Sequence, residues 1–265
     1  MSSFPFRLAA FDLDGTLLSG PSSMGEANAA ALHDLVARGV VVAPATARFH
    51  AVALLPFASA GLQVPAVSCA GADVRHADGR VIELRALPGA CGRFLADLCD
   101  RAGWRATFAT TDRAFRLAPD LPPWAATPPP YLAAVTSFAD VDVGSVLNAL
   151  IYARPDDPWL RELDAWADAV NIHTAITHDG LELVTITAAG VDKGSGLAAL
   201  CTAYDFDTAE AVVFGDSDVD LPMFAIAGHA VAMEGAPPDV RARAHSTAPS
   251  APGGVATAIS GLLAG

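Results

Sequence analysis

Residues 11–18 read Phe-Asp-Leu-Asp-Gly-Thr-Leu-Leu, and the stretch from Asp12 to Thr16 decides the predicted fold. It follows a short apolar segment, residues 7–11, that is typical of a buried β-strand. In open α/β sheets, ligands bind beyond the carboxyl ends of the strands. Two carboxylates placed there, Asp12 and Asp14, can act as a nucleophile and as a proton donor. Gly15 permits the tight turn, although such residues are also common in ordinary polar turns.

Strand-like and helix-like segments alternate on both sides of this turn. Helices are predicted over residues 26–38, 51–60, 195–204, 221–226, 238–244 and 253–263, and Pro56 should kink or split the second of them. Strands are predicted over residues 40–43, 65–68, 211–214 and 230–233. This order predicts an α/β fold, a Rossmann-like parallel sheet with helices on both faces.

The middle of the chain follows a different pattern. Helices are predicted near residues 91–102, 142–149 and 158–168, and strands over 81–87, 105–109, 115–118, 149–153, 170–176 and 180–188. The proline-rich stretch 119–130 predicts an extended loop. We therefore predict a catalytic core made of residues 1–81 and 189–265, with residues 82–188 as an inserted α+β domain.

Composition excludes several classes of protein. Of the 265 residues, 52% are hydrophobic and 17% are charged, which is not the composition of a disordered chain. No segment reaches the roughly 18 apolar residues of a membrane span, and no signal-peptide pattern is visible. The net charge of −13 predicts that neither nucleic acid nor a membrane surface is a partner. The four cysteines show no zinc-binding spacing and predict a reducing, cytoplasmic setting; nothing predicts an oligomeric state.

A second acidic stretch, Gly215-Asp-Ser-Asp-Val-Asp220, also follows an apolar strand. Clustered carboxylates at a strand end suit Mg²⁺, which prefers one or two carboxylates together with water and substrate phosphate. Taken alone, the stretch fits a solvated helix N-terminus equally well, because the helix dipole stabilises acidic residues there. Two acidic strand ends in one α/β chain favour the metal site.

Thr46 and Lys193 are candidates for holding phosphate. Thr46 follows the strand 40–43, where a hydroxyl and backbone N–H groups can bind an anion, although threonine is also a common helix cap. Lys193 opens a predicted helix and is the only lysine beside fifteen arginines. A compact ammonium is preferred where a planar guanidinium does not fit, although one residue in such a place can also be chance.

The motifs together resemble the haloacid dehalogenase (HAD) superfamily of phosphohydrolases, and within it the Cof-like group with a type C2 cap. The resemblance rests on FDLDGTLL at 11–18, ATAR at 45–48, AGADV at 70–74, VDKGSGL at 191–197, GDSDVDLPMF at 215–224 and VAMEGA at 231–236. It covers most of the chain in order. It implies that the insert 82–188 is the cap domain.

The resemblance also implies a role for each motif residue. Asp12 corresponds to the nucleophile that forms an aspartyl-phosphate, and Asp14 to the general acid and base. Phosphate or substrate binding is implied for Thr16, Thr46, Arg48 and Lys193. The implied Mg²⁺ ligands are Asp12, the backbone carbonyl of Asp14, and Asp216, with Asp220 as the second acid of the metal site. The implied partner is a small phosphorylated substrate.

The chain departs from the group's pattern at three amide positions. Ala70, Val219 and Gly235 stand where the group usually has asparagine, and Ala47 replaces a glycine. The leading hypothesis is a Mg²⁺-dependent phosphomonoester hydrolase acting on a small metabolite such as a sugar phosphate. A phosphosugar mutase of the phosphomannomutase type is the first alternative. A weakly active relative that binds a phosphorylated metabolite is the second, and the missing amides motivate it.

Overall fold

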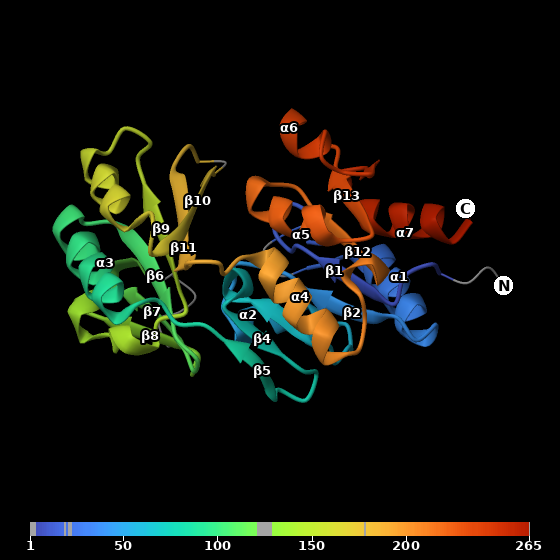
Figure 1. Cartoon of the computed structure of the whole chain (residues 1–265), viewed down its shortest axis with the longest axis horizontal. Helices are drawn as coiled ribbons and strands as arrows, with labels where there is room; N and C mark the ends of the chain where they lie inside the picture. The colour runs from blue at the N-terminus through green and yellow to red at the C-terminus, as the bar shows by residue number, and fades with distance from the viewer. Residues whose placement is uncertain (1–3, 19, 21–22, 121–128, 178, 265) are drawn as a thin grey trace. The chain divides into compact units, whose positions relative to one another are not determined.

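The computed structural model describes residues 4–18, 20, 23–120, 129–177 and 179–264. The chain divides into two compact units, shown with their elements in Figure 1. Unit 1 comprises residues 1–83 and 192–265, and unit 2 comprises residues 84–191. These bounds lie within a few residues of the predicted ones. The roles of catalytic core and cap remain predictions. Among the described helices, none is long and apolar enough to cross a membrane.

Unit 1 is built on a parallel sheet of five strands in the order β14-β13-β12-β1-β2. Its strands are β1 (Leu8–Phe11), β2 (Val41–Pro44), β12 (Ala211–Gly215), β13 (His229–Met233) and β14 (Ser246–Ala248). In Figure 1 the blue start and the orange end of the chain interleave, because β1 lies between β2 and β12. The central pair is in register, with Phe11 beside Phe214.

Helices cover both faces of this sheet. They are α1 (Glu26–Ala37), α2 (His50–Ser59), α4 (Lys193–Ala203), α5 (Leu221–Ile226), α6 (Pro238–Arg241) and α7 (Gly254–Ala264). Alternate strand residues point to opposite faces. Phe11 and Phe214 therefore pack with α1, α2 and α7, while Leu8 and Val213 pack with α4, α5 and α6. Both clusters are almost wholly buried, as expected of a parallel sheet.

A smaller three-stranded sheet completes unit 1, and its first two strands are antiparallel. It contains β3 (Ala66–Ser68), β4 (Asp73–Arg75) and β5 (Val81–Leu84). A turn of 3₁₀ helix, η1 (Cys69–Gly71), links the first two strands, and Ala45 bridges to Val67 beside it. Two further 3₁₀ turns, η7 (Thr208–Glu210) and η8 (Asp218–Asp220), flank β12. The small sheet thus extends from the strand end that carries Thr46.

Unit 2 is an α+β unit with a six-stranded sheet in the order β10-β11-β9-β6-β7-β8. The strands are β6 (Arg105–Ala109), β7 (Ala114–Leu117), β8 (Leu132–Val135), β9 (Asn148–Ala153), β10 (Val170–Ile176) and β11 (Glu182–Ala188). Helix α3 (Gly89–Ala102) accompanies them, and the described residues of this unit also form the 3₁₀ segments η2 (Ala118–Asp120), η4 (Phe138–Asp140), η5 (Val143–Ser145) and η6 (Pro158–Trp166). One sheet face packs with α3, through residues such as Phe108 and Ile151.

Several local predictions for the secondary structure were wrong. The helix expected over residues 142–149 is the short turn η5 followed by β9, because Ala149 and Ile151 alternate into the core as strand residues do. The helix predicted near residues 158–168 is present, as the 3₁₀ helix η6. Helix α2 runs unbroken through Pro56, whose ring is buried by packing. Strands β4, β8 and β14 were not predicted, and most of the proline-rich loop lies outside the described residues.

Candidate active site

The turn after β1 packs directly against the turn after β12. The backbone N–H of Asp12 donates to the carbonyl of Phe214, 2.9 Å away. Gly15 has a φ of +84°, and a Cβ built there would lie 2.1 Å from Oδ2 of Asp216. Only glycine meets both conditions without strain. The Thr16 hydroxyl donates to Oδ1 of Asp216 at 3.3 Å. The two acidic motifs therefore form one site.

Three carboxylates meet at this point. Asp12, Asp216 and Asp220 each offer an oxygen, and these oxygens lie within 4.8 Å of one another. Asp12 and Asp220 are buried, and Asp216 is half-buried. Carboxylate oxygens are the hard ligands that Mg²⁺ prefers. The donor set therefore fits a divalent metal ion, and the prediction that the two acidic motifs share a site agrees with their placement.

Lys193, the first residue of α4, completes the cluster. Its Nζ donates to Oδ1 of Asp12 and to Oδ1 of Asp220, at 2.6 Å in each case. The side chain is 1% exposed, so both ion pairs are screened from water. The start of α4 is fixed by a capping box in which Asp192 accepts from the Ser195 N–H and Ser195 Oγ accepts from the Asp192 N–H. A helix start held this firmly places the ammonium beside the nucleophile candidate.

The charges of the cluster do not balance. Burial raises the pKa of Asp12 well above its usual range, although the Lys193 charge opposes the shift. Burial, and then the charge of Asp220, raises the pKa of Asp216 to about 6. For Lys193, burial favours a lower pKa, but the charges of Asp12 and Asp220 outweigh it and raise the pKa. Three carboxylates beside one ammonium leave a negative excess that a bound cation would neutralise.

Asp220 is the most fully hydrogen-bonded member of the cluster. Its Oδ1 accepts from Lys193, while its Oδ2 accepts from the backbone N–H groups of Asp216 and Ser217 at 2.9 and 3.0 Å. The Ser217 hydroxyl adds a third donor to Oδ2, at 3.2 Å. The carboxylate is thus oriented by its own loop. Sequence reasoning missed Ser217, although a serine three residues before an aspartate at a helix start is a recognisable capping pattern.

Asp14 lies apart from the three carboxylates. Its side chain is 63% exposed and forms a two-point ion pair with Arg48, at 2.7 Å to Nε and 2.5 Å to Nη2. Thr46 is buried, and its hydroxyl accepts from the Arg48 N–H at 3.2 Å. The structure therefore groups the eight predicted residues in two sets. Asp12, Thr16, Lys193, Asp216 and Asp220 form one hydrogen-bonded cluster, and Asp14, Thr46 and Arg48 form the other.

A left-handed turn supports the Thr46 loop. Cys69 and Ala70 have φ values of 50° and 54°, and Gly71 follows at 100°. The N–H groups of Cys69 and Ala70 donate to the carbonyls of Arg48 and Thr46, at 2.9 Å each. Asparagine tolerates this conformation better than alanine. At Ala70, the asparagine of the related pattern therefore corresponds to a backbone requirement.

We expect Ala70→Gly to stabilise the protein. A left-handed alanine costs about 1 kcal/mol, and glycine removes that strain. Ala72→Gly is the matched control, since Ala72 is equally buried but has a φ of −77°. That change should destabilise by roughly 0.5–1 kcal/mol. Urea unfolding of both variants measures the difference. Equal destabilisation by the two glycines would show that the turn carries no strain at Ala70.

The other two departures from the amide pattern follow the strands β12 and β13. Val219 is half-buried in η8, between the exposed Asp218 and the buried Asp220. Gly235 is exposed, and its N–H donates to the Ser250 hydroxyl at 2.6 Å. Valine offers no oxygen to the acidic cluster. Val219 is therefore the departure that bears most directly on a metal ion.

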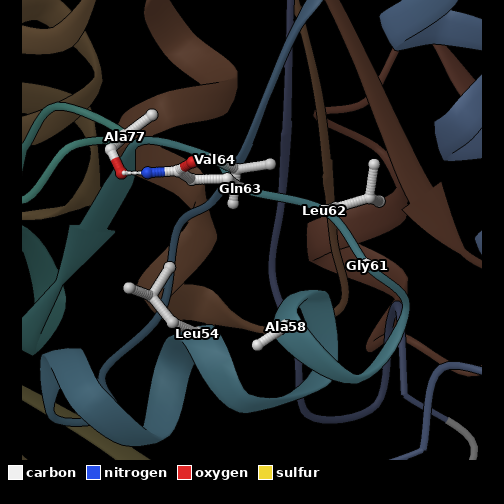
Figure 2. Close-up of a pocket in the computed structure, with 7 residues that line it drawn as sticks. All are labelled: Leu54, Ala58, Gly61, Leu62, Gln63, Val64 and Ala77. Carbon is white, nitrogen blue, oxygen red and sulfur yellow. Dashed lines mark hydrogen bonds between the residues drawn. The ribbon is translucent and has the colours of Figure 1, made fainter.

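A hollow elsewhere in unit 1 shows none of this chemistry. It has a volume of about 300 Å³ and lies between α2 and the segment that follows it. Figure 2 shows its lining: Leu54, Ala58, Gly61, Leu62, Gln63, Val64 and Ala77. Its one polar side chain, Gln63, donates to the Ala77 carbonyl at 2.9 Å. None of the predicted site residues lines it, so the acidic cluster remains the candidate site.

A family model supports the same conclusion from the sequence as a whole. The model for haloacid dehalogenase-like hydrolases matches residues 9–259. The chain belongs to the haloacid dehalogenase-like hydrolase family. The match spans both units, including the insert of unit 2. The resemblance inferred from the motifs is therefore confirmed.

Two similar proteins are phosphatases. An HMP-PP phosphatase of Serratia proteamaculans is 27% identical, over 89% of this chain and 86% of that protein. The 5-amino-6-(5-phospho-D-ribitylamino)uracil phosphatase YwtE of Bacillus subtilis is 26% identical, over 98% of this chain and 99% of that protein. The prediction of an enzyme, a HAD-type phosphatase, is confirmed.

Solved structures show the same fold. A haloacid dehalogenase-like hydrolase from B. subtilis has a TM-score of 0.83 and 20% identity, covering 96% of this chain and 99% of that one. A HAD subclass IIB sugar phosphatase has a TM-score of 0.81 and 21% identity, covering 97% and 99%. At this identity the likeness concerns the fold alone. The predicted fold class, a parallel HAD core with an inserted α+β domain, is confirmed.

Proposed function

We propose that this HAD enzyme is a Mg²⁺-dependent phosphomonoester hydrolase. Its substrate is a small phosphorylated metabolite of the sugar-phosphate type, and it works through an aspartyl-phosphate. The observation that carries the proposal is the buried Asp12 carboxylate, held 2.6 Å from Lys193 beside two further carboxylates. Four buried free cysteines fit a reducing compartment, which supports a cytoplasmic setting.

Asp12 is the proposed nucleophile. One of its oxygens attacks phosphorus, and the bond from phosphorus to the leaving oxygen breaks. Lys193 and the hydroxyl of Thr46 hold the phosphoryl oxygens, so that the charge on the anion is compensated where it meets Asp12. Water then attacks the aspartyl-phosphate, which releases inorganic phosphate and restores the carboxylate.

Asp14 is the proposed general acid and base. It gives its proton to the leaving oxygen in the first step and takes a proton from water in the second. Both oxygens of its carboxylate accept hydrogen bonds from Arg48 in the structure, so Arg48 orients the Asp14 side chain. Arg48 has a second proposed role, which is contact with the substrate.

The metal ion would be held by Asp12 and Asp216, together with the backbone carbonyl of Asp14. When bound, it neutralises negative charge between the nucleophile and the phosphate. Asp220 contributes charge and orients Lys193, since hydrogen bonds already occupy both of its oxygens. Thr16 orients Asp216 through the hydroxyl contact, besides its proposed place near the phosphate.

Release of inorganic phosphate from a panel of phosphorylated metabolites with Mg²⁺ tests the function. The panel includes sugar phosphates and the compounds in the names of the two relatives. Release without any sugar bisphosphate supports the hydrolase. Transfer that needs a bisphosphate activator identifies the mutase instead. Saturable binding with neither turnover nor an aspartyl-phosphate identifies the weakly active binder.

We expect Val219→Asn to lower the Mg²⁺ concentration that half-activates the enzyme. An added amide can hold a water of the metal, and such outer contacts change metal affinity by roughly 10–100-fold. Half-activation of the natural enzyme should then fall in the millimolar range. A Mg²⁺ titration of activity for the two proteins makes the comparison, with Val219→Ala as the control for size. Coincident curves for all three would assign Val219 to packing alone.

A further inference from the structure

The peptide between Val191 and Asp192 joins the two units, because unit 2 ends at Val191 and unit 1 resumes at Asp192. Both polar atoms of this peptide are held. The carbonyl oxygen of Val191 accepts from Thr187 Oγ1 at 2.5 Å and from Asn171 Nδ2 at 2.9 Å. The N–H of Asp192 donates to Ser195 Oγ at 3.0 Å. Hydrogen bonds at both ends therefore fix the plane of this linking peptide. The bonds from Thr187 and Asn171 to the Val191 carbonyl are called the clamp below.

The clamp is built into unit 2. Thr187 on β11 and Asn171 on β10 lie opposite each other in the sheet, which brings a hydroxyl and an amide to one carbonyl. A carbonyl oxygen has two lone pairs, and the two donors fill both. Thr187 is 1% exposed, so water cannot replace its hydroxyl without a structural change. Asn171 Oδ1 also accepts from the Gly190 N–H, at 3.4 Å.

The clamped peptide lies immediately before the Lys193 helix. Asp192 is the N-cap of α4, and Lys193 is its first residue. The Asp192 carbonyl is in close contact with Gly71, where a Cβ would lie only 2.0 Å from its oxygen. Movement of the Val191 carbonyl therefore turns a peptide whose other end caps the helix. The start of α4 therefore has little room to adjust when this peptide rotates.

We propose that Thr187 and Asn171 are positioning residues for Lys193, acting through the Val191–Asp192 peptide. The catalytic part of this inference rests on the proposed function. Lys193 Nζ bonds two carboxylates at 2.6 Å, so a small displacement breaks at least one contact. A misplacement of about 1 Å at a reacting group can cost on the order of 100-fold in rate. Neither positioning residue is one of the HAD motif residues.

Lys193 can be observed directly because it is the only lysine. Protein labelled with ¹⁵N and ¹³C in lysine alone gives one side-chain spin system, whose Nζ and Cε shifts report the two ion pairs. Thr187→Val keeps the shape and removes the hydroxyl. The control is Thr185→Val, two residues earlier on the same face of β11 and also buried. Thr187→Ser restores a hydroxyl.

The expected result is a shifted Lys193 signal in Thr187→Val, with the natural signal kept in Thr185→Val and recovered in Thr187→Ser. Turnover should follow the same order, with kcat about tenfold lower in Thr187→Val and a smaller change in KM. An unchanged lysine signal in folded Thr187→Val overturns the inference, as does an equal shift in Thr185→Val. If the natural enzyme hydrolyses no phosphate ester, the proposed function fails, and the lysine signal still decides the clamp.

Discussion

Asp12→Asn is expected to abolish turnover, with a fall in kcat of about 1000-fold or more, because an amide is a poor nucleophile. The fold should persist. Asparagine has nearly the same shape, and Lys193 keeps its bond to Asp220 when the Asp12 charge is lost. The measurement is phosphate release from the best substrate of the panel, with the folded state checked by thermal unfolding.

Two further variants separate a nucleophile from a metal ligand. Asp216→Asn removes an acidic oxygen of the cluster without touching the attacking group, so high Mg²⁺ concentrations should restore part of its activity. The same concentrations should not restore Asp12→Asn. Asp34→Asn, on the exposed surface of α1, controls for the loss of one negative charge. Retained phosphatase activity in Asp12→Asn would remove Asp12 from the nucleophile role.

Lys193→Arg is expected to lose activity by about 100-fold or more although the positive charge is kept. The ammonium fits between two carboxylates at 2.6 Å in a site with almost no exposure. A guanidinium is planar and larger, and it must displace either Asp12 or Asp220 to enter. Overfilling a buried site of this kind also costs roughly 1–3 kcal/mol of stability.

Lys193→Met gives the complementary measurement. It keeps an unbranched chain of similar length and removes the charge, which leaves three carboxylates without their ammonium. Breaking a buried ion pair typically destabilises by about 3–5 kcal/mol. Urea unfolding and phosphate release for the Arg and Met variants separate shape from charge. A Lys193→Arg enzyme with near-natural kcat would show that the site needs only a positive charge there.

The sequence predicted the parts of the site that depend on strand order. Asp12 and Asp216 were each predicted to follow a strand, and the structure adds that these two parallel strands are neighbours. Lys193 was found by its isolation among arginines. The bond from Asp14 to Arg48 could not be predicted, because the direction of an exposed side chain in a turn leaves no periodic signal.

The errors in the fold arose where short apolar runs fit two structures. The strand predicted over residues 149–153 is present, but the preceding apolar residues also fit a helix, and the start of β9 at Asn148, paired on both sides in the sheet, is a tertiary property. Ala70 could not be assigned a left-handed backbone, since alanine, unlike glycine or asparagine, does not adopt it routinely. The anchoring of Val191 by Asn171 likewise depends on sheet register, which no local pattern sets.

The surroundings of the single lysine also affect how readily the enzyme reacts with electrophilic small molecules. Acyl phosphates, aldehydes and reducing sugars damage proteins mainly by adding to lysine amines in their neutral form. Here the one such side chain is buried, and the charges of Asp12 and Asp220 outweigh the effect of burial and hold its pKa above the usual range, which keeps it protonated. Acylation of that side chain should therefore be slow while both ion pairs hold, because a protonated amine has no lone pair with which to attack the electrophile.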